Sequence, residues 1–235
     1  MTLQNSKPKS ELIRPEITRL PALTLWRRLF RFIFRSLVRI AVRTCTRIYV
    51  EGLENLPRKG PLIIVSNHLG DADVLVGMTV TSIPVDIIVK SELYDFPVLG
   101  KILDAYGVIW VHRGQPDRRA VRVALESLRR GRIIGIAPEG RESLTGALEE
   151  GTEGAAYLAL TSKAPVWPVT FTHTENQRIL SNLKRFKRTP VTVTIGSAFY
   201  LDAHPNWRLG IEAGTLKIMR TLASQLPPEY QGVYR

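Results

Sequence analysis

Cysteine is almost absent from the sequence, because the 235 residues contain only Cys45. A single cysteine excludes an internal disulfide and fits a reducing compartment. The four histidines and this cysteine are scattered without the spacing of zinc ligands, so we expect no metal site. The first twenty residues contain no apolar segment of the kind that forms the centre of a signal peptide. We therefore expect neither a disulfide framework nor a signal peptide.

Acidic residues are few beside the basic ones. Asp and Glu total 21 against 33 Lys and Arg, which gives a formal charge of +12 and an isoelectric point near 10.2. A charge this large indicates an anionic partner, and nucleic acid, anionic lipid and a phosphorylated substrate all qualify. The length and the 44% hydrophobic content suffice for one sizeable domain.

Two regions precede that domain. Residues 1–20 are polar and charged, and we interpret them as an N-terminal tail. Over residues 21–48, apolar and aromatic residues alternate with arginines, which stand at 27, 28, 31, 35, 39, 43 and 47. No apolar run there approaches the ~20 residues that a membrane-spanning helix needs.

A basic amphipathic segment of this kind is typical of helices that lie in the membrane interface. We expect two helices, broken near Ser36 or Thr44, that rest on an anionic membrane surface. The alternative is a helix that packs its apolar face on its own domain and leaves its basic face in solvent.

Residues 49–235 alternate short apolar runs with amphipathic stretches. The predicted strands are 48–50, 62–65, 85–89, 107–112, 133–137, 166–171 and 191–195, and the predicted helices are 73–81, 117–131, 154–162 and 209–226. Strands that alternate with helices indicate an α/β domain with a mostly parallel central sheet flanked by helices. Pro168 indicates that its strand is an edge strand or is irregular.

His68 and Asp73 follow the predicted strand 62–65, at the end of the strand where open α/β sheets bind ligands. Five positions correspond to a rotation of roughly 140° on one helix, so the chain must bend for the two side chains to meet, and Gly70 would permit the bend. A paired Asp73 would fix the tautomer of His68 and leave its other nitrogen available as a base. The alternative is a histidine that only caps the end of a strand.

Two more predicted strands end in polar residues. Arg113 follows one of them, and Glu139, Gly140 and Arg141 follow the other. A glycine beside an arginine suits an anion, since backbone N–H groups and a guanidinium both bind phosphate. Three polar strand ends in one α/β domain predict an active site at that edge of the sheet.

Over roughly residues 50–235, the sequence resembles the 1-acylglycerol-3-phosphate acyltransferase (PlsC-like) family. The N-H-x4-D motif of that family stands here as Asn67, His68 and Asp73. Its second motif stands as residues 107–113 (GVIWVHR) and its third, usually F-P-E-G-T-R-S, as residues 137–143 (APEGRES). Its short apolar fourth motif is residues 164–169 (APVWPV).

The resemblance implies that a fatty acyl group moves from acyl-CoA or acyl-acyl-carrier-protein to the hydroxyl of lysophosphatidic acid, which gives phosphatidic acid. His68 would be the general base and Asp73 would orient it. Arg113 and Arg141, with Gly140, would hold the phosphate of the acceptor, and Glu139 would fix that loop or touch the glycerol. No cofactor is expected besides the thioester co-substrate. The expected location is the cytoplasmic face of the cell membrane, as a peripheral or monotopic protein.

Two departures from the family pattern keep other acceptors open. Glu142 occupies the usual arginine position of the third motif, and Arg141 stands one position early. His112 takes a place where the family often has an acid, and we interpret it as structural. The acceptor could instead be another lysolipid or polar lipid. A basic nucleic-acid-binding protein is disfavoured because no aromatic stacking platform is visible, and an inactive membrane scaffold is disfavoured because His68 and Asp73 are both present.

Overall fold

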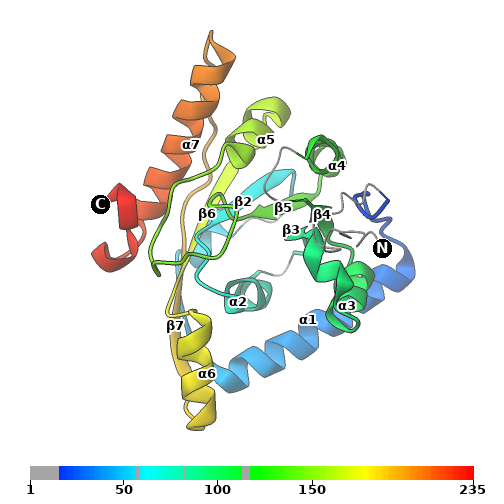
Figure 1. The fold of residues 1–235 in the computed structure, drawn as a ribbon, viewed down its shortest axis with the longest axis vertical. Helices are drawn as coiled ribbons and strands as arrows, with labels where there is room; N and C mark the ends of the chain where they lie inside the picture. Colours follow the sequence, from blue (N-terminus) through cyan, green and yellow to red (C-terminus); the bar gives the residue numbers. More distant parts are fainter. Residues whose placement is uncertain (1–15, 57–58, 82, 113–116) are drawn as a thin grey trace, which may run out of the picture.

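The computed structural model describes residues 16–56, 59–81, 83–112 and 117–235. Seven strands form one sheet in the order β1-β7-β6-β2-β5-β3-β4 (Figure 1). All neighbouring strands are parallel except β6 and β7, which are antiparallel. The strands are β1 (Thr46–Glu51), β2 (Leu62–Ser66), β3 (Val85–Lys90), β4 (Ile109–Val111), β5 (Ile133–Ile136), β6 (Val166–Thr172) and β7 (Thr189–Ile195). The predicted α/β domain with a mostly parallel sheet is confirmed.

Helices cover both faces of this sheet. One face carries α1 (Leu25–Cys45), α2 (Ala72–Val80), α3 (Leu99–Tyr106) and α6 (Asn176–Lys184). The other face carries α4 (Arg118–Arg129), α5 (Gly154–Ser162) and α7 (Trp207–Ser224). Short 3-10 turns complete the described chain, namely η2 (Leu53–Asn55), η3 (Ser91–Asp95), η4 (Pro228–Tyr230) and η5 (Gly232–Tyr234).

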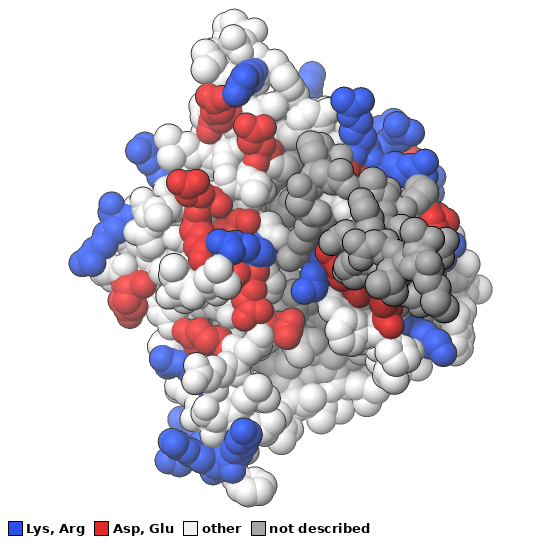
Figure 2. Space-filling view, viewed as in Figure 1, with Lys and Arg blue, Asp and Glu red and all other residues white. Residues whose placement is uncertain are grey.

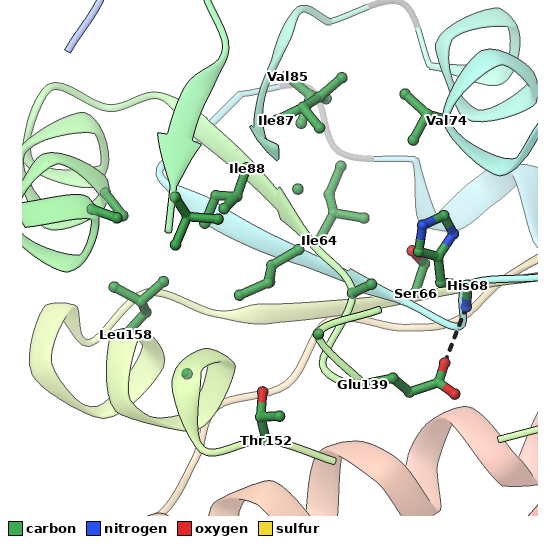
Figure 3. A pocket seen from close by; sticks show the side chains of 18 of the residues that line it. Ile64, Ser66, His68, Val74, Val85, Ile87, Ile88, Glu139, Thr152 and Leu158 are labelled. Carbon is green, nitrogen blue, oxygen red and sulfur yellow. Dashed lines mark hydrogen bonds between the residues drawn. The ribbon is translucent and has the colours of Figure 1, made fainter. Parts of the chain in front are cut away.

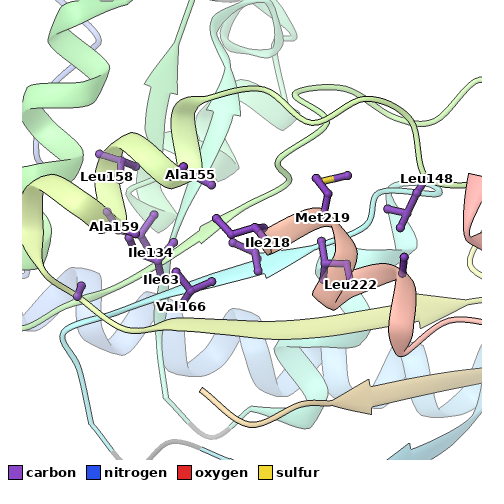
Figure 4. Packing of buried hydrophobic residues seen from close by; sticks show 14 of the residues in the cluster. Ile63, Ile134, Leu148, Ala155, Leu158, Ala159, Val166, Ile218, Met219 and Leu222 are labelled. Atoms are coloured by element: carbon purple, nitrogen blue, oxygen red, sulfur yellow. The ribbon is translucent and has the colours of Figure 1, made fainter. Parts of the chain in front are cut away.

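The larger core lies between the sheet and the α4–α5–α7 layer (Figure 4). Ile63, Ile134 and Val166 come from three adjacent strands, and each is at most 2% exposed. Ala155 and Ala159 of α5 are also buried, and their small side chains bring this helix close to the strands. The sheet is therefore firmly supported beneath the loops that leave its carboxyl ends.

Pro168 does not lie on an edge strand, so that part of the sequence prediction is wrong. β6 pairs with β2 on one side and β7 on the other. The predicted irregularity is present, because Val166 bridges Phe199 whereas Val169 pairs with Ile195, which shifts the antiparallel register by one residue. The carbonyl of Pro168 accepts from the N–H of Gly196 on this irregular side, where a missing proline N–H interrupts no regular ladder.

The N-terminal segment forms one helix rather than two. α1 is continuous over 21 residues, and Ser36 lies within it with its hydroxyl bonded to the carbonyl of Phe32. The chain leaves the helix after Cys45 and enters β1 directly. The predicted break is therefore wrong, because the capping group Thr24 and the tertiary contacts of α1 support a single helix.

Two arginines of α1 point into the protein, whereas many of its large apolar residues point outward. Arg31 and Arg35 are 3% and 7% exposed. On the opposite side Trp26 and Phe32 are each 70% exposed, and Ile40 is 65% exposed. The edge of the molecule along which α1 runs accordingly shows mainly uncharged side chains (Figure 2). The alternative of a helix with a solvated basic face is contradicted at Arg31 and Arg35, although other apolar residues of α1, namely Phe30, Phe34, Val38 and Val42, do pack on the domain.

Two helix ends explain this orientation. Arg27 donates to the carbonyl of Ala105, and Arg31 donates to the carbonyls of Tyr106 and Gly107, all at the C-terminus of α3. Arg35 donates to the carbonyls of Met78 and Thr81 at the C-terminus of α2. The last carbonyls of a helix lack partners inside it and carry partial negative charge, so cations bind them favourably. The arginine series thus caps two neighbouring helices.

Arg31 also forms a buried ion pair with Asp86 of β3, at 2.8 Å between Nη2 and Oδ1. The other oxygen of Asp86 accepts from the hydroxyl of Ser127 on α4 at 2.8 Å and lies 3.4 Å from the guanidinium of Arg132. Asp86 therefore joins helices on both faces of the sheet.

We expect Arg31→Ala to lower the free energy of unfolding by about 3 kcal/mol, because removing one member of a buried ion pair leaves the other charge under-compensated. Arg28→Ala is the matched control, since Arg28 is exposed on the same helix, and it should change stability by no more than about 0.5 kcal/mol. Urea unfolding of the purified variants measures both values. Equal, small losses would show that the Arg31–Asp86 pair does not hold α1 in place.

Candidate active site

The structure brings His68 and Asp73 together. The chain bends after β2, and Asp73 lies in the first turn of α2. Its Oδ2 lies 2.9 Å from Nδ1 of His68 and also accepts from the N–H groups of Leu69 at 2.7 Å and Gly70 at 3.0 Å. A carboxylate accepts hydrogen bonds, so Nδ1 carries the proton and Nε2 is the nitrogen able to accept one. The geometry predicted for this pair is present.

Gly70 serves a different purpose from the one expected. Its backbone does not enter the left-handed region, so the bend needs no glycine for that reason. A Cβ at this position would lie 2.8 Å from the carbonyl of Thr174 and 2.7 Å from Oδ1 of Asn176. The glycine therefore permits the loop after β6 to approach the loop that carries His68.

The backbone of His68 is held on both sides by the loop that follows β5. Its N–H donates to Oε1 of Glu139 at 3.1 Å, and its carbonyl accepts from the N–H of Ser143 at 2.8 Å. Oε2 of Glu139 accepts from the N–H of Glu149 at 2.9 Å, which ties the far end of the same loop to this carboxylate. Figure 3 shows Glu139 reaching the backbone of His68, whose ring turns into a cavity.

Burial raises the pKa of Glu139 from its ordinary 4.5 to about 7, although the hydrogen bonds from the N–H groups of Glu149 and His68 act in the opposite direction. The residue is 6% exposed. Transfer of a carboxylate out of water disfavours its charged form, and two amide donors only partly compensate.

Asn67 fastens the same segment to the other neighbouring strand. Its side chain, which is 2% exposed, donates to the carbonyl of Phe171 at 2.9 Å and accepts from the N–H of that residue at 2.8 Å. The side-chain amide thus continues the pairing of β2 with β6 where the backbone of β2 turns away. From the sequence, Asn67 is recognisable as part of a motif but has no predicted role.

The predicted anion-binding residues have less free positive charge than the sequence suggested. Arg141 reaches the cavity, and its Nη2 lies 2.6 Å from Oε2 of Glu149. The hydrogen bond from the N–H of Leu144 and the charge of Arg141 lower the pKa of Glu149, so this carboxylate is ionised. Glu142 accepts from the side-chain amide of Asn176 at 3.1 Å. Acidic side chains gather over this region in Figure 2.

Three other predicted residues stand as follows. Gly140 has a φ of +74° and its N–H donates to the carbonyl of Ala137, so glycine suits this tight turn. Arg113 lies outside the described residues.

His112 reaches the cavity, and its N–H donates to Oδ2 of Asp117, which also caps α4. The structural role of His112 stays a prediction.

The cavity beside His68 has a volume of about 1160 Å³ and is mainly aliphatic. Its walls include Ile64, Val74 and Leu158, which come from β2, α2 and α5 (Figure 3). β3 pairs with β5 only as far as Ile87, and its pairing with β4 begins at Ile88, so the sheet opens at this point. The lining includes residues from both strands and from the helices on both faces, so this opening forms part of a mainly apolar cavity that His68 also lines.

Among its described residues, the site contains no group of metal ligands. Within the described ranges, no cluster of three or more His, Cys, Asp and Glu side chains has the arrangement of a metal site. The polar groups of the site instead bind one another, and the chemistry that the geometry supports is proton transfer at His68 next to an apolar chain.

Comparisons with known proteins identify the family of this chain. A family model described as Acyltransferase matches residues 47–172. A 1-acyl-sn-glycerol-3-phosphate acyltransferase of Borreliella burgdorferi is 30% identical over 161 residues, which cover 68% of this chain and 61% of that protein. A protein of the same name from Bacillus subtilis is 26% identical over 175 residues, which cover 73% of this chain and 83% of that protein.

The fold also matches a solved structure. The PlsC 1-acyl-sn-glycerophosphate (LPA) acyltransferase of Thermotoga maritima superposes with a TM-score of 0.63 at 21% identity, over 86% of this chain and 83% of that chain. An identity this low shows the fold alone. The matched region is about 61% of the length of the Borreliella protein and 41% of the chloroplast enzyme LPAT1 of Arabidopsis thaliana.

We expect the raised pKa of Glu139 to make stability depend on pH. An exposed glutamic acid loses its proton near 4.5, whereas folded Glu139 keeps it up to about 7. The folded state therefore binds more protons in that window, and its stability falls as pH rises through it, by on the order of 3 kcal/mol from this group. Urea unfolding at pH 4.5 and pH 7.5 measures the change.

Glu139→Gln is the control because it cannot titrate, and the pH-dependent loss should be smaller in this variant by that amount. If wild type and variant lost the same stability between the two pH values, Glu139 would not hold its proton in the folded protein.

Proposed function

Since the chain belongs to the acyltransferase family, we propose that it moves a fatty acyl group from a thioester donor, acyl-CoA or acyl-acyl-carrier-protein, to the free hydroxyl of lysophosphatidic acid. The product would be phosphatidic acid. The observation that carries this proposal is the His68–Asp73 pair, which lines a large, mainly apolar cavity.

In the proposed mechanism, Nε2 of His68 takes the proton of the acceptor hydroxyl as its oxygen attacks the thioester carbon. Collapse of the tetrahedral intermediate forms the ester and breaks the carbon–sulfur bond, and the departing thiolate takes the proton from His68. Asp73 holds the ring in the required tautomer and stabilises its positive charge. No acyl-enzyme forms, so the chain needs no nucleophilic side chain of its own.

The aliphatic part of the cavity supports the lipid nature of the substrates. Each methylene that leaves water for such a wall stabilises the complex by about 0.8 kcal/mol. A fatty acyl chain lying between α2 and α5 would present its carbonyl end to His68. The remaining charge of Arg141 lies at the same cavity, where it would meet the acceptor phosphate.

We further propose that α1 holds the protein on the cytoplasmic face of the cell membrane. No helix in the described part of the chain has the length and apolar character that crossing a bilayer requires. The outward face of α1 instead carries large apolar residues, of which Leu25 is 84%, Trp26 is 70% and Leu37 is 60% exposed. A helix with such a face lies in the interface plane, as a peripheral or monotopic anchor.

A second candidate is acyl transfer to a lysolipid or polar lipid that lacks a free phosphate. The observation that favours it is the charge around the site, because Glu149 neutralises Arg141 and Glu142 stands where the family motif has arginine. Two carboxylates near the acceptor would suit a zwitterionic or cationic head group.

A panel of acceptors distinguishes the two candidates. Purified protein with acyl-CoA and vesicles receives lysophosphatidic acid, lysophosphatidylcholine or an ornithine lysolipid, and mass spectrometry identifies the products. We expect phosphatidic acid as the main product, and we expect Arg141→Ala to raise the KM for lysophosphatidic acid about 3- to 10-fold, because one partly exposed charge contact is lost.

Arg129→Ala is the matched control, since Arg129 is similarly exposed, lies on α4 and pairs with Glu126. Preferential acylation of a phosphate-free acceptor, with no effect of Arg141→Ala, would select the second candidate instead.

A further inference from the structure

The turn between α6 and β7 projects a cluster of apolar and basic side chains. We call Leu180, Leu183 and residues 184–187 (KRFK) the α6 tip. Leu180, Leu183 and Phe186 are 55%, 48% and 99% exposed. No acidic residue occurs between positions 176 and 201, so the tip has no local counter-charge. In Figure 2 a basic cluster accordingly lies at the lower end of the molecule, where Figure 1 places α6.

Phe186 occupies a backbone position that disfavours it. Its φ is +54°, and the N–H of Lys187 donates to the carbonyl of Asn182 at 2.9 Å, which closes the C-terminus of α6. Glycine is the usual residue at this left-handed position after a helix, because a side chain there is strained. Phe186 therefore bears strain and gains almost no packing against the described part of the chain, so neither local conformation nor folding accounts for the ring.

The basic residues of the tip lack acidic partners among the residues that the structure describes. Lys184, Arg185 and Lys187 are exposed, and in the ranges that the structure covers none of them forms an ion pair. A strained, fully exposed aromatic ring between unpaired cations matches the interface of an anionic bilayer, where rings enter the acyl boundary and cations meet head groups.

The base of the tip is fixed to the end of α1. Nε and Nη2 of Arg188 donate to the carbonyl of Thr46, the C-cap of α1, at 3.0 and 2.7 Å. The nearest exposed apolar residue of α1 toward this end is Ile40, which is 65% exposed. α1 runs along the lower edge of the molecule, and α6 continues beyond its C-terminal end (Figure 1). The apolar face of α1 and the tip can therefore meet one flat surface.

We propose that the α6 tip is a second membrane-contact element, in which Phe186 inserts at the acyl boundary of an anionic bilayer while Lys184, Arg185 and Lys187 bind lipid phosphates. The inference rests on the proposed function in one respect, namely that the substrate of the proposed acyl transfer is a membrane lipid. Together the tip and α1 fix the rotation of the protein on the membrane, because one helix lying on a surface can still roll about its axis.

Vesicle co-sedimentation of the full chain tests the proposal, with neutral phosphatidylcholine vesicles compared with vesicles that also contain phosphatidylglycerol. The charge variant is Lys184→Gln/Arg185→Gln/Lys187→Gln, and we expect about 100-fold weaker binding to the anionic vesicles at low salt and little change on neutral ones. High salt should reduce the difference between wild type and variant.

Phe186→Gly isolates the ring. Glycine relieves the positive φ, so the variant should unfold at a temperature no lower than that of the wild type. Its binding to both kinds of vesicle should nevertheless fall about 10-fold, because the buried ring is lost. If Phe186→Gly is no less stable than the wild type but binds membranes more weakly, the ring contributes to contact with lipid and not to folding.

Two controls make the result specific. Arg129→Gln/Arg130→Gln/Arg208→Gln removes the same charge from α4 and α7, where all three residues are paired with Glu126 or Glu212. Phe32→Gln/Ile40→Gln removes exposed apolar groups of α1. The proposal is overturned if the tip variants bind vesicles as the wild type does, or if the charge control loses as much vesicle binding as the charge variant of the tip. It is also overturned if the tip variant loses binding to duplex DNA while its binding to vesicles is unchanged.

Acyl transfer to a short-chain, soluble lysophosphatidic acid is measured in parallel. If the wild type transfers the acyl group and the tip variants bind vesicles as the wild type does, this inference alone is overturned. If the wild type transfers the acyl group to no acceptor, the result counts against the proposed function instead.

Discussion

The arrangement of the site depends on the way the backbone of His68 is held. A histidine at the end of a strand would ordinarily lie on a loose connection, but here both its N–H and its carbonyl bind the loop after β5. Glu139 supplies one of these contacts and joins the far end of the loop as well. Asn67 binds β6 on the opposite side. Because three neighbouring strands hold one residue, its ring has a fixed position relative to Asp73 and to the cavity.

A second constraint is the distribution of charge on α1. Carbonyls at the ends of α2 and α3, together with Asp86, bind the guanidinium groups of Arg27, Arg31 and Arg35. With these three arginines directed inward, the helix leaves large apolar residues on the surface. The same contacts that complete the ends of two internal helices therefore produce an outward face suited to lipid, and they hold α1 against α2, the helix that carries Asp73. Stability and the proposed membrane contact have one origin in this helix.

Local signals in the sequence predicted much of this protein. Periodicity and turn residues located the strands, and Asp117 caps α4 as its position indicates. The motif that contains His68 and Asp73 predicted their contact, whereas their spacing alone left it open. The partners of the charged side chains could not be predicted, because no local pattern specifies them. Glu149 neutralises Arg141 from eight residues away, and Arg31 meets Asp86 across 55 positions. The inward direction of the arginines was missed for the same reason, since helix C-termini that bind them come from other parts of the chain. The α6 tip carried a visible local signal, an aromatic residue among four basic ones, in a region (172–190) for which neither a helix nor a strand was predicted.

The central claim is that His68 accepts the proton of the acceptor hydroxyl. The most direct test is thiol release from acyl-CoA by purified protein on anionic vesicles, with and without lysophosphatidic acid, in wild type, His68→Ala and His112→Ala. Both histidines reach the cavity, so the second variant controls for a change in its wall. The account predicts that acceptor-dependent release falls about 10²- to 10⁴-fold in His68→Ala and changes little in His112→Ala. Full acceptor-dependent release by His68→Ala would contradict it.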